Sequence, residues 1–144
     1  MTKIPVVLAV LYREGEYLLQ LRDDIPTIIY PGMWAVFGGH LDPGEETAVG
    51  FRREIQEEIG YQVGDDFEQY DIFEDERVCR YLFRAELKVP LSKLTLNEGQ
   101  DFGLFKPEQI LTGQCFSSKL NAYRQLAPSH SQLLTTYFNK YHPD

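Results

Sequence analysis

The sequence predicts a mixed α/β (α+β) fold, because strand-like and helix-like hydrophobic patterns alternate along a chain of single-domain length. We expect the 144 residues to form one domain, residues 1–144, whose core needs neither a disulfide nor a structural metal. Hydrophobic residues make up 43% of the chain and charged residues 25%, as in ordinary globular proteins. Several short runs rich in β-branched and aromatic residues predict strands, and two longer stretches carry helical periodicity.

The N-terminal part predicts a β-hairpin followed by a loop. Residues 6–12 and 17–21 are β-rich, and residues 13–16 between them contain a glycine suited to a hairpin turn. The first apolar run is only eight residues long and lacks a small-residue cleavage site, so we expect neither a signal peptide nor a membrane span. Residues 23–33 contain two prolines and a glycine and predict a loop, which leads to a short strand at residues 34–37.

Residues 46–59 predict an amphipathic helix. Its apolar positions recur at helical spacing and are Ala48, Phe51, Ile55 and Ile59. Gly60 follows directly and suits the left-handed conformation that often ends a helix. The segment before the helix is expected to be a tight loop rather than a strand, because it contains three glycines, namely Gly38, Gly39 and Gly44.

The second half of the chain predicts further strands and ends in a helix. The expected elements are strands at residues 67–73 and 77–87, a polar loop at 91–101, a short strand at 103–105, a short helix at 107–111 and a helix at 129–141. The last helix carries Leu133, Leu134, Tyr137 and Phe138 at helical spacing. Tyr137 and Tyr141 are expected to pack this helix or to form a dimer contact, so a homodimer is one expectation.

The predicted central helix has a strongly acidic face. Glu54, Glu57 and Glu58 stand at i, i+3 and i+4, so their carboxylates share one side of the helix. Like charges at these spacings repel each other, and Arg52 and Arg53 can supply only part of the counter-charge. A divalent cation is the natural complement. Because oxygen ligands select a hard ion, we expect Mg²⁺, with Mn²⁺ as the alternative.

Residues 39–61, GHLDPGEETAVGFRREIQEEIGY, closely resemble the Nudix box, G-x5-E-x7-R-E-U-x-E-E-x-G-U, in which U is aliphatic. The matching positions are Gly39, Glu45, Arg53, Glu54, Ile55, Glu57, Glu58 and Gly60. Tyr61 departs from the pattern, at a packing position where the family usually has an aliphatic residue. The resemblance to the Nudix hydrolase family extends to Trp34 upstream and to EGQDFGLFKPEQI at residues 98–110, and so covers most of the chain.

This resemblance implies an α/β/α sandwich around a mixed β-sheet and a loop-helix-loop catalytic segment. It implies hydrolysis of a nucleoside diphosphate linked to another moiety, with water attacking phosphorus at the diphosphate bridge. The implied metal ligands are Glu54, Glu57 and Glu58, joined by Glu45 and by the main chain of Gly39. Glu45 and Arg53 are expected to brace the loop against the helix, and the Gly38 and Gly39 main chain to approach the cation or substrate.

For five charged positions outside the box the expected roles are less specific. Glu98 lies where family members often carry an acid that positions or deprotonates the attacking water, with Asp101 as the next choice; a solubilising loop glutamate is the alternative. Arg22 ends the second strand, where the family frequently has a phosphate-facing arginine; the alternative is a charge that reaches water. Arg80 and Arg84 alternate with apolar residues and are expected to face solvent rather than substrate phosphates.

Composition restricts the partners and the compartment. The net charge of −8 argues against a nucleic acid polymer or an anionic membrane as a partner. Cys79 and Cys115 lie far apart and have no metal-ligand spacing, which fits a reduced cytoplasm. Trp34 and Phe37 are expected in the core rather than stacked on a base, and His40 is expected to be a local hydrogen-bonding group rather than a proton carrier.

Three functions remain open. A nucleoside triphosphate, including an oxidised one, is the first substrate class. A nucleotide sugar is the second, because YPGMW at residues 30–34 partly resembles that branch of the family. A nucleotide-binding sensor without turnover is the third, but such domains often lose box acids. This chain keeps the four box acids Glu45, Glu54, Glu57 and Glu58, which favours an enzyme.

Overall fold

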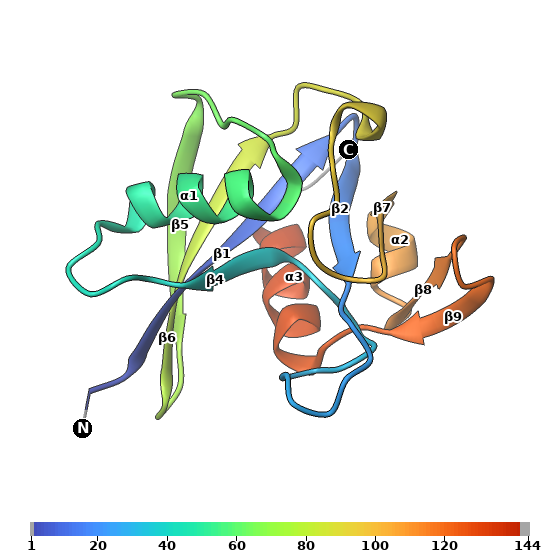
Figure 1. Cartoon of the computed structure of the whole chain (residues 1–144), viewed down its shortest axis with the longest axis horizontal. Helices are drawn as coiled ribbons and strands as arrows, with labels where there is room; N and C mark the ends of the chain where they lie inside the picture. The colour runs from blue at the N-terminus through green and yellow to red at the C-terminus, as the bar shows by residue number, and fades with distance from the viewer. Residues whose placement is uncertain (1, 142–144) are drawn as a thin grey trace. The chain divides into compact units, whose positions relative to one another are not determined.

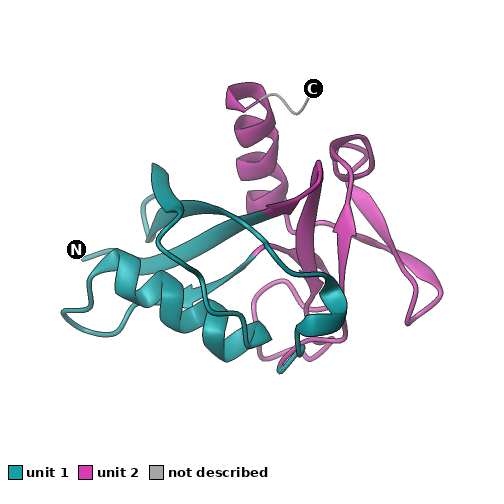
Figure 2. Ribbon diagram, turned by 90° about the horizontal axis from the view of Figure 1, so that it is seen from above, with its two compact units in different colours: residues 1–11, 37–97 teal, residues 12–36, 98–144 magenta. Residues whose placement is uncertain are grey.

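The computed structural model (Figure 1) describes residues 2–141. These residues fall into two compact units, coloured separately in Figure 2. Unit 1 contains residues 1–11 and 37–97, and unit 2 contains residues 12–36 and 98–144. The first strand begins in unit 1 and ends in unit 2. The expectation that residues 1–144 form one domain stays a prediction.

Every strand and helix expected from the sequence has a counterpart (Figure 1). In unit 1 the elements are β1 (Ile4–Arg13, whose last two residues lie in unit 2), β4 (Phe37–His40), α1 (Thr47–Ile59), β5 (Phe67–Glu74), β6 (Val78–Glu86) and the short 3-10 helix η1 (Leu91–Lys93). In unit 2 they are β2 (Glu16–Leu21), β3 (Trp34–Ala35), β7 (Asp101–Phe105), α2 (Pro107–Ile110), β8 (Gln114–Ser117), β9 (Ala122–Gln125) and α3 (Pro128–Lys140).

Unit 1 is built on strands that neighbour one another in the order β4, β1, β6, β5. Strand β4 runs antiparallel to β1, and β5 runs antiparallel to β6. Helix α1 packs through the ring of Phe51, which stacks on Phe83 with 4.6 Å between ring centroids and 4° between ring planes. The predicted apolar face is confirmed at Phe51, Ile55 and Ile59, which are buried together with Gly50, whereas Ala48 is only half-buried. The opposite face is therefore left for the acidic residues.

The glycine pair before α1 lies in a strand, so the predicted loop at this point is wrong. Gly38 and Gly39 belong to β4 and pair with Leu8 and Val7 of β1. A Cβ atom on Gly38 would overlap the carbonyl oxygen of Val7. Glycine is needed here because two backbones approach closely, which is a different requirement from the flexibility of a turn.

Unit 2 begins with the predicted hairpin between β1 and β2. Glu14 and Gly15 form its turn with φ values of 51° and 79°, and Arg13 stands opposite Glu16. Two residues with positive φ are typical of a type I′ turn, whose twist matches that of the strands. Strand β2 also pairs with β3 and β7. The hairpin thus anchors the sheet of this unit.

Helix α3 covers the sheet of unit 2 with the predicted apolar face. Its buried residues are Leu133, Leu134, Tyr137 and Phe138. The ring of Tyr17 on β2 meets Tyr137 and Phe138 edge-on, at centroid distances of 5.8 and 5.0 Å. The packing role expected of Tyr137 is confirmed, whereas a homodimer stays a prediction.

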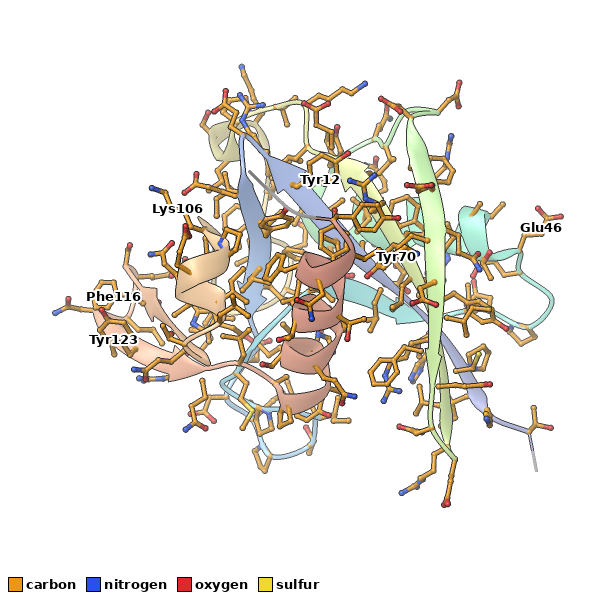
Figure 3. The ribbon with its side chains drawn as sticks, turned by 180° about the vertical axis from the view of Figure 1, so that it is seen from behind. Tyr12, Glu46, Tyr70, Lys106, Phe116 and Tyr123 are labelled. Atoms are coloured by element: carbon orange, nitrogen blue, oxygen red, sulfur yellow. The ribbon has the colours of Figure 1, made fainter. Side chains whose placement is uncertain are left out.

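The hairpin formed by β8 and β9 has no counterpart in the sequence analysis. Each strand has only four residues, and three of the four in β9 are exposed. Such short and mostly polar strands give no periodic apolar signal. The rings of Phe116 and Tyr123 meet edge-on across the hairpin, 5.2 Å apart (Figure 3). This contact stabilises the hairpin only after it has formed.

The predicted α+β class with a central mixed sheet is confirmed. Antiparallel pairs predominate, and a parallel bridge joins Trp34 to Leu126. Cys79 and Cys115 are both free thiols, in line with the cysteine pattern of the sequence. Within residues 2–141, no helix is both long and apolar enough to cross a membrane.

Candidate active site

Helix α1 presents the box acids because it begins and ends close to where the sequence predicts. Glu46 precedes its first turn with an extended backbone (Figure 3), and the helix runs from Thr47 to Ile59. Gly60 takes the predicted left-handed conformation at φ 67° and donates its N–H to the carbonyl of Gln56. The acids at positions 54, 57 and 58 therefore lie in the last two turns of the helix.

Arg53 lies at the centre of the acidic face. Its Nε and Nη2 atoms donate to both carboxylate oxygens of Glu45, at 2.8 and 2.9 Å. Its Nη1 atom reaches Glu54 at 3.1 Å and Glu57 at 3.3 Å. Nη2 also donates to the carbonyl of His40 at 3.1 Å. Hydrogen bonding to Glu45 raises the pKa of Arg53 further above its ordinary value, so this guanidinium is permanently charged.

Glu45 joins the loop before α1 to the helix. Its carboxylate forms the two-pronged pair with Arg53 and accepts the main-chain N–H of Asp42 at 2.9 Å. These two interactions, the arginine first, lower the pKa of Glu45 from 4.5 to about 2. Its side chain is only 10% exposed. Glu45 and Arg53 thus form the brace that the resemblance implies.

Glu54 is held in a different environment. Its side chain is 13% exposed, and burial raises the pKa of its carboxyl group, an effect that Arg53 partly opposes. A Cβ atom on Gly39 would lie 2.5 Å from Glu54 Oε2. The missing side chain at residue 39 therefore leaves the space that the carboxylate occupies. This explains why a glycine stands in β4 opposite the acidic face.

The other two helix acids are placed differently from Glu54. Glu58 Oε1 accepts the main-chain N–H of Gly38 at 2.9 Å, which ties the end of α1 to β4. Glu57 has a side chain that is 59% exposed and makes only long contacts with Arg53, at 3.3 and 3.4 Å. Of the three acids, Glu57 is therefore the one most accessible to a ligand from solvent.

The carboxylates around Arg53 suit a hard cation, although they do not yet converge on one point. Four carboxylates contact Arg53, namely those of Asp42, Glu45, Glu54 and Glu57. When all four are ionised, the single positive charge of Arg53 leaves a net of three negative charges. All the donors are oxygens, the ligands that Mg²⁺ and Mn²⁺ prefer. Across residues 2–141, no three carboxylate, imidazole or thiol groups converge closely enough to make a ready metal site. A cation would have to draw these carboxylates together.

The remaining predicted site residues, Glu98 and Arg22, lie in unit 2. Glu98 is exposed, in the bend that precedes β7. Arg22 donates from its Nε to the carbonyl of Ile29 at 2.8 Å, which ties it to its own loop. The roles expected of these two residues in water activation and phosphate binding stay predictions.

Three charged residues differ from expectation or have a clear local role. Arg80 and Arg84 were expected to face solvent, and this is wrong, because their side chains are only 11% and 22% exposed. The Arg80 guanidinium stacks on the ring of Phe73 and pairs with Asp75, which removes it from water. Asp101, the second choice after Glu98, accepts the hydroxyl of Ser117 at 2.7 Å and so stabilises the β8–β9 hairpin.

The aromatic residues beside the glycines are core residues, as predicted. Trp34 and Phe37 are 1% and 0% exposed, and the indole N–H of Trp34 donates to the carbonyl of Cys115 at 2.9 Å. His40 is exposed and takes part in the acidic network through its main-chain carbonyl. The role expected of the His40 side chain stays a prediction.

Sequence reasoning missed Asn97, which binds the end of α1. Its side-chain Nδ2 donates to the carbonyl of Glu57 at 2.8 Å across 40 residues of sequence. A polar residue in a predicted loop gives no signal of such a contact, because the contact depends on tertiary structure. A count of the carbonyls left unpaired at the end of the predicted helix could have shown that donors were needed.

Comparison with known proteins gives a family match over most of the chain. The model of the NUDIX domain matches residues 2–126. Nucleoside triphosphatase NudI from Escherichia coli O17:K52:H18 is 29% identical over 120 residues, which are 74% of this chain and 84% of that protein.

Solved structures agree in fold. The MutT protein from Methanosarcina mazei Go1 superposes with a TM-score of 0.74 at 21% identity, covering 99% of each chain. The NUDIX domain of Shewanella oneidensis NrtR, solved in complex with ADP ribose, gives a TM-score of 0.71 at 18% identity and covers 97% of this chain and 89% of that one. At these identities the structures show a shared fold.

Proposed function

The chain belongs to the NUDIX domain family and is a Nudix pyrophosphohydrolase, and from this premise we propose that it hydrolyses nucleoside triphosphates in the presence of a divalent cation. The bond broken is a diphosphate linkage, which water attacks at phosphorus. Mg²⁺ is the proposed cofactor, with Mn²⁺ as an alternative. The relative named nucleoside triphosphatase NudI supports this substrate class.

One observation carries the proposal: two carboxylates of α1 and two of the preceding loop surround a single guanidinium, that of Arg53. The residues that would hold the cation are Glu54, Glu57 and Glu58, with Glu45 and the main chain of Gly39. When bound, the cation would neutralise charge on the phosphoryl oxygens and make water a better nucleophile. An acidic surface without a ligand would not need the partly buried Glu54 carboxylate, whose charged form is disfavoured by burial.

The chain's own residues have distinct proposed roles. Arg53 holds Glu45 rigidly and leaves Glu57 loosely held, so the exposed acid can turn toward a ligand. Gly38 orients Glu58 through its main-chain N–H. Glu98 is proposed to position or deprotonate the attacking water, and Arg22 to bind a substrate phosphate.

Two alternatives use the same residues differently. A nucleotide sugar would be cleaved at the same linkage, with residues 30–34 contributing to its recognition. A sensor would bind a nucleotide without turnover, and the ADP ribose held by the NrtR domain is an example of such a ligand on a similar fold. The complete set of box acids favours turnover over a sensor.

We further infer a small nucleotide as the partner, rather than a nucleic acid polymer or a membrane. The net charge of −8 would repel both of these anionic partners. The two free thiols fit the reduced cytoplasm that the sequence suggests. A homodimer remains compatible with this proposal.

The test is a panel of nucleoside triphosphates, nucleotide sugars and ADP ribose, each assayed with Mg²⁺, with Mn²⁺ and with excess EDTA. We expect triphosphates to be hydrolysed fastest, and EDTA to abolish the reaction. Identification of both products shows which phosphoryl bond breaks. Cleavage of sugars alone would establish the first alternative, and binding without products would establish the sensor.

A further inference from the structure

The end of helix α1 is closed by a distant segment of the chain. The last four carbonyls of a helix lack partners within the helix itself. Here all four are bonded: Gln56 by the N–H of Gly60 at 3.0 Å, Glu57 by Asn97 Nδ2 at 2.8 Å, Glu58 by the N–H of Asn97 at 3.0 Å, and Ile59 by the N–H of Thr95 at 3.1 Å. We call residues 95–97 the strap. Three of the four bonds come from it.

Only one of these bonds is local. Gly60 provides the usual left-handed ending of a helix and satisfies a single carbonyl. The strap follows η1 in the chain (the yellow segment of Figure 1) and supplies the rest. Asn97 is its principal residue, because it donates twice, once from the side chain and once from the main chain. Its two acceptors belong to consecutive residues of the helix.

Those two acceptors are the main-chain carbonyls of Glu57 and Glu58, the pair of acids in the last turn. Helix ends fray when their carbonyls are left to water, and fraying would let these two carboxylates move apart. From strand β4, the main-chain N–H of Gly38 donates to the Glu58 carboxylate. Asn97 therefore holds the backbone of the turn that carries the Glu57 and Glu58 carboxylates.

We propose that Asn97 is a positioning residue that keeps the last turn of α1 in register for cation binding by Glu57 and Glu58. The inference rests on the proposed function, since it assumes that these acids hold a cation. Asn97 acts through the helix backbone and does not itself touch the cation or the substrate. A carboxylate pair on a fixed turn binds a cation without first having to order that turn, so losing the bond weakens affinity.

The experiment compares Asn97→Ala with Thr95→Ala. Asn97→Ala removes the Nδ2 donor and keeps the main-chain bond to Glu58. Thr95→Ala changes a neighbouring exposed side chain whose contribution to the strap comes from the main chain alone, so it is the matched control. Mn²⁺ affinity is measured by titration without substrate. Urea unfolding measures the global stability of each variant.

We expect Asn97→Ala to bind Mn²⁺ about tenfold more weakly, as is typical when a residue supporting a metal ligand is lost. Thr95→Ala should bind like the wild type. The Mg²⁺ concentration giving half-maximal activity should rise by the same factor in Asn97→Ala. A purely structural role would lower stability and leave the Mn²⁺ affinity of the folded protein unchanged, and that result would overturn the proposal.

Amide hydrogen exchange gives a second readout on the wild type. Coupling is reciprocal, so if the strap favours cation binding, Mg²⁺ must slow exchange of the Asn97 amide. Unchanged exchange at saturating Mg²⁺ would also overturn the role of Asn97. A wild type that binds neither Mn²⁺ nor Mg²⁺ would instead refute the proposed function, so the two failures are distinguishable.

Discussion

Two of the places in unit 1 where carboxylates meet arginines differ in which partner is in excess. In the turn between β5 and β6, one carboxylate, Asp75, accepts from the N–H groups of Arg77 and Val78, both at 2.9 Å, and from Arg80 at 3.1 Å. On α1, one guanidinium serves four carboxylates. An excess of donors satisfies an acid completely and makes it structural. An excess of acids leaves negative charge that a cation can neutralise.

The pKa shifts in the two regions are opposite, in agreement with this difference. Backbone hydrogen bonds lower the pKa of Asp75 from 3.8 to about 2, so its charged form is stabilised by the fold. Burial raises the pKa of Glu54, so the fold alone disfavours its charged form. A fold that tolerates this cost at Glu54 gains from a bound cation, which Asp75 does not need.

The largest expected effect is on the acid-rich side. Glu57→Gln removes the most accessible carboxylate and keeps its shape. We expect kcat to fall by more than about a hundredfold, beyond the ten- to hundredfold cost typical of changes next to a metal ligand. Circular dichroism and urea unfolding should show an intact fold. Glu76→Gln, which removes a charge from the β5–β6 turn, is the control and should retain full activity. Equal activity in both variants would remove the proposed mechanism.

A smaller effect is expected from filling the space at Gly39. In Gly39→Ala the new Cβ would meet the Glu54 carboxylate at 2.5 Å, so the side chain must move. We expect kcat to fall about ten- to hundredfold, with a loss of about 1–3 kcal/mol in stability from overpacking. Gly64→Ala is the matched control, because no atom lies within 4 Å of a Cβ there. Similar kinetics for the two alanine variants would show that the position of Glu54 is unimportant.

Asp101, in unit 2, tests whether a carboxylate that is fully hydrogen-bonded within the fold has a purely structural role. Asp101 accepts from the Ser117 hydroxyl, and Ser117 is fully buried. Ser117→Ala should lower the free energy of unfolding by about 1–3 kcal/mol, because the half-buried Asp101 carboxylate loses a hydrogen bond. Activity per folded molecule should be unchanged, which is checked by assays well below the unfolding temperature. A large loss of kcat in fully folded Ser117→Ala would connect Asp101 to the reaction.

Features set by a local sequence pattern could be predicted, whereas features set by contacts between distant residues could not. Helix α1 and its acidic face were predictable, because 13 residues carry a sustained helical period and Gly60 marks the end. The strand at Gly38 was missed, because glycine signals a turn and a close backbone approach equally well. The contact of Asn97 with Glu57 was also missed, since it joins residues 40 positions apart. Local patterns thus predict where the acids lie, and only the fold shows what holds them.

Arg80 shows why alternation can mislead. Its strand position alternates with apolar residues and predicts exposure to solvent, yet its guanidinium lies 4.9 Å from the centroid of the Phe73 ring and pairs with Asp75. Arginine can cover an aromatic ring and still satisfy its charge, so a charged residue at an alternating position does not prove an exposed face. The acid that pairs with it lies in the turn, where periodicity gives no information.

The smallest predicted effect concerns the pH dependence of the donor-rich region. Asp75 has a pKa of about 2 in the folded protein and 3.8 ordinarily. Its charged form therefore stabilises the fold above about pH 4, and this contribution disappears as the pH falls through about 2. Asp75→Asn should be less stable than the wild type at pH 7, and the difference in urea unfolding should shrink steadily below about pH 4. Glu76→Gln removes the same charge in the same turn and controls for net charge. If the loss of unfolding free energy in Asp75→Asn stayed constant down to pH 2.5, it would come from a change in the shape of the turn. The charge of Asp75 would then contribute nothing to stability.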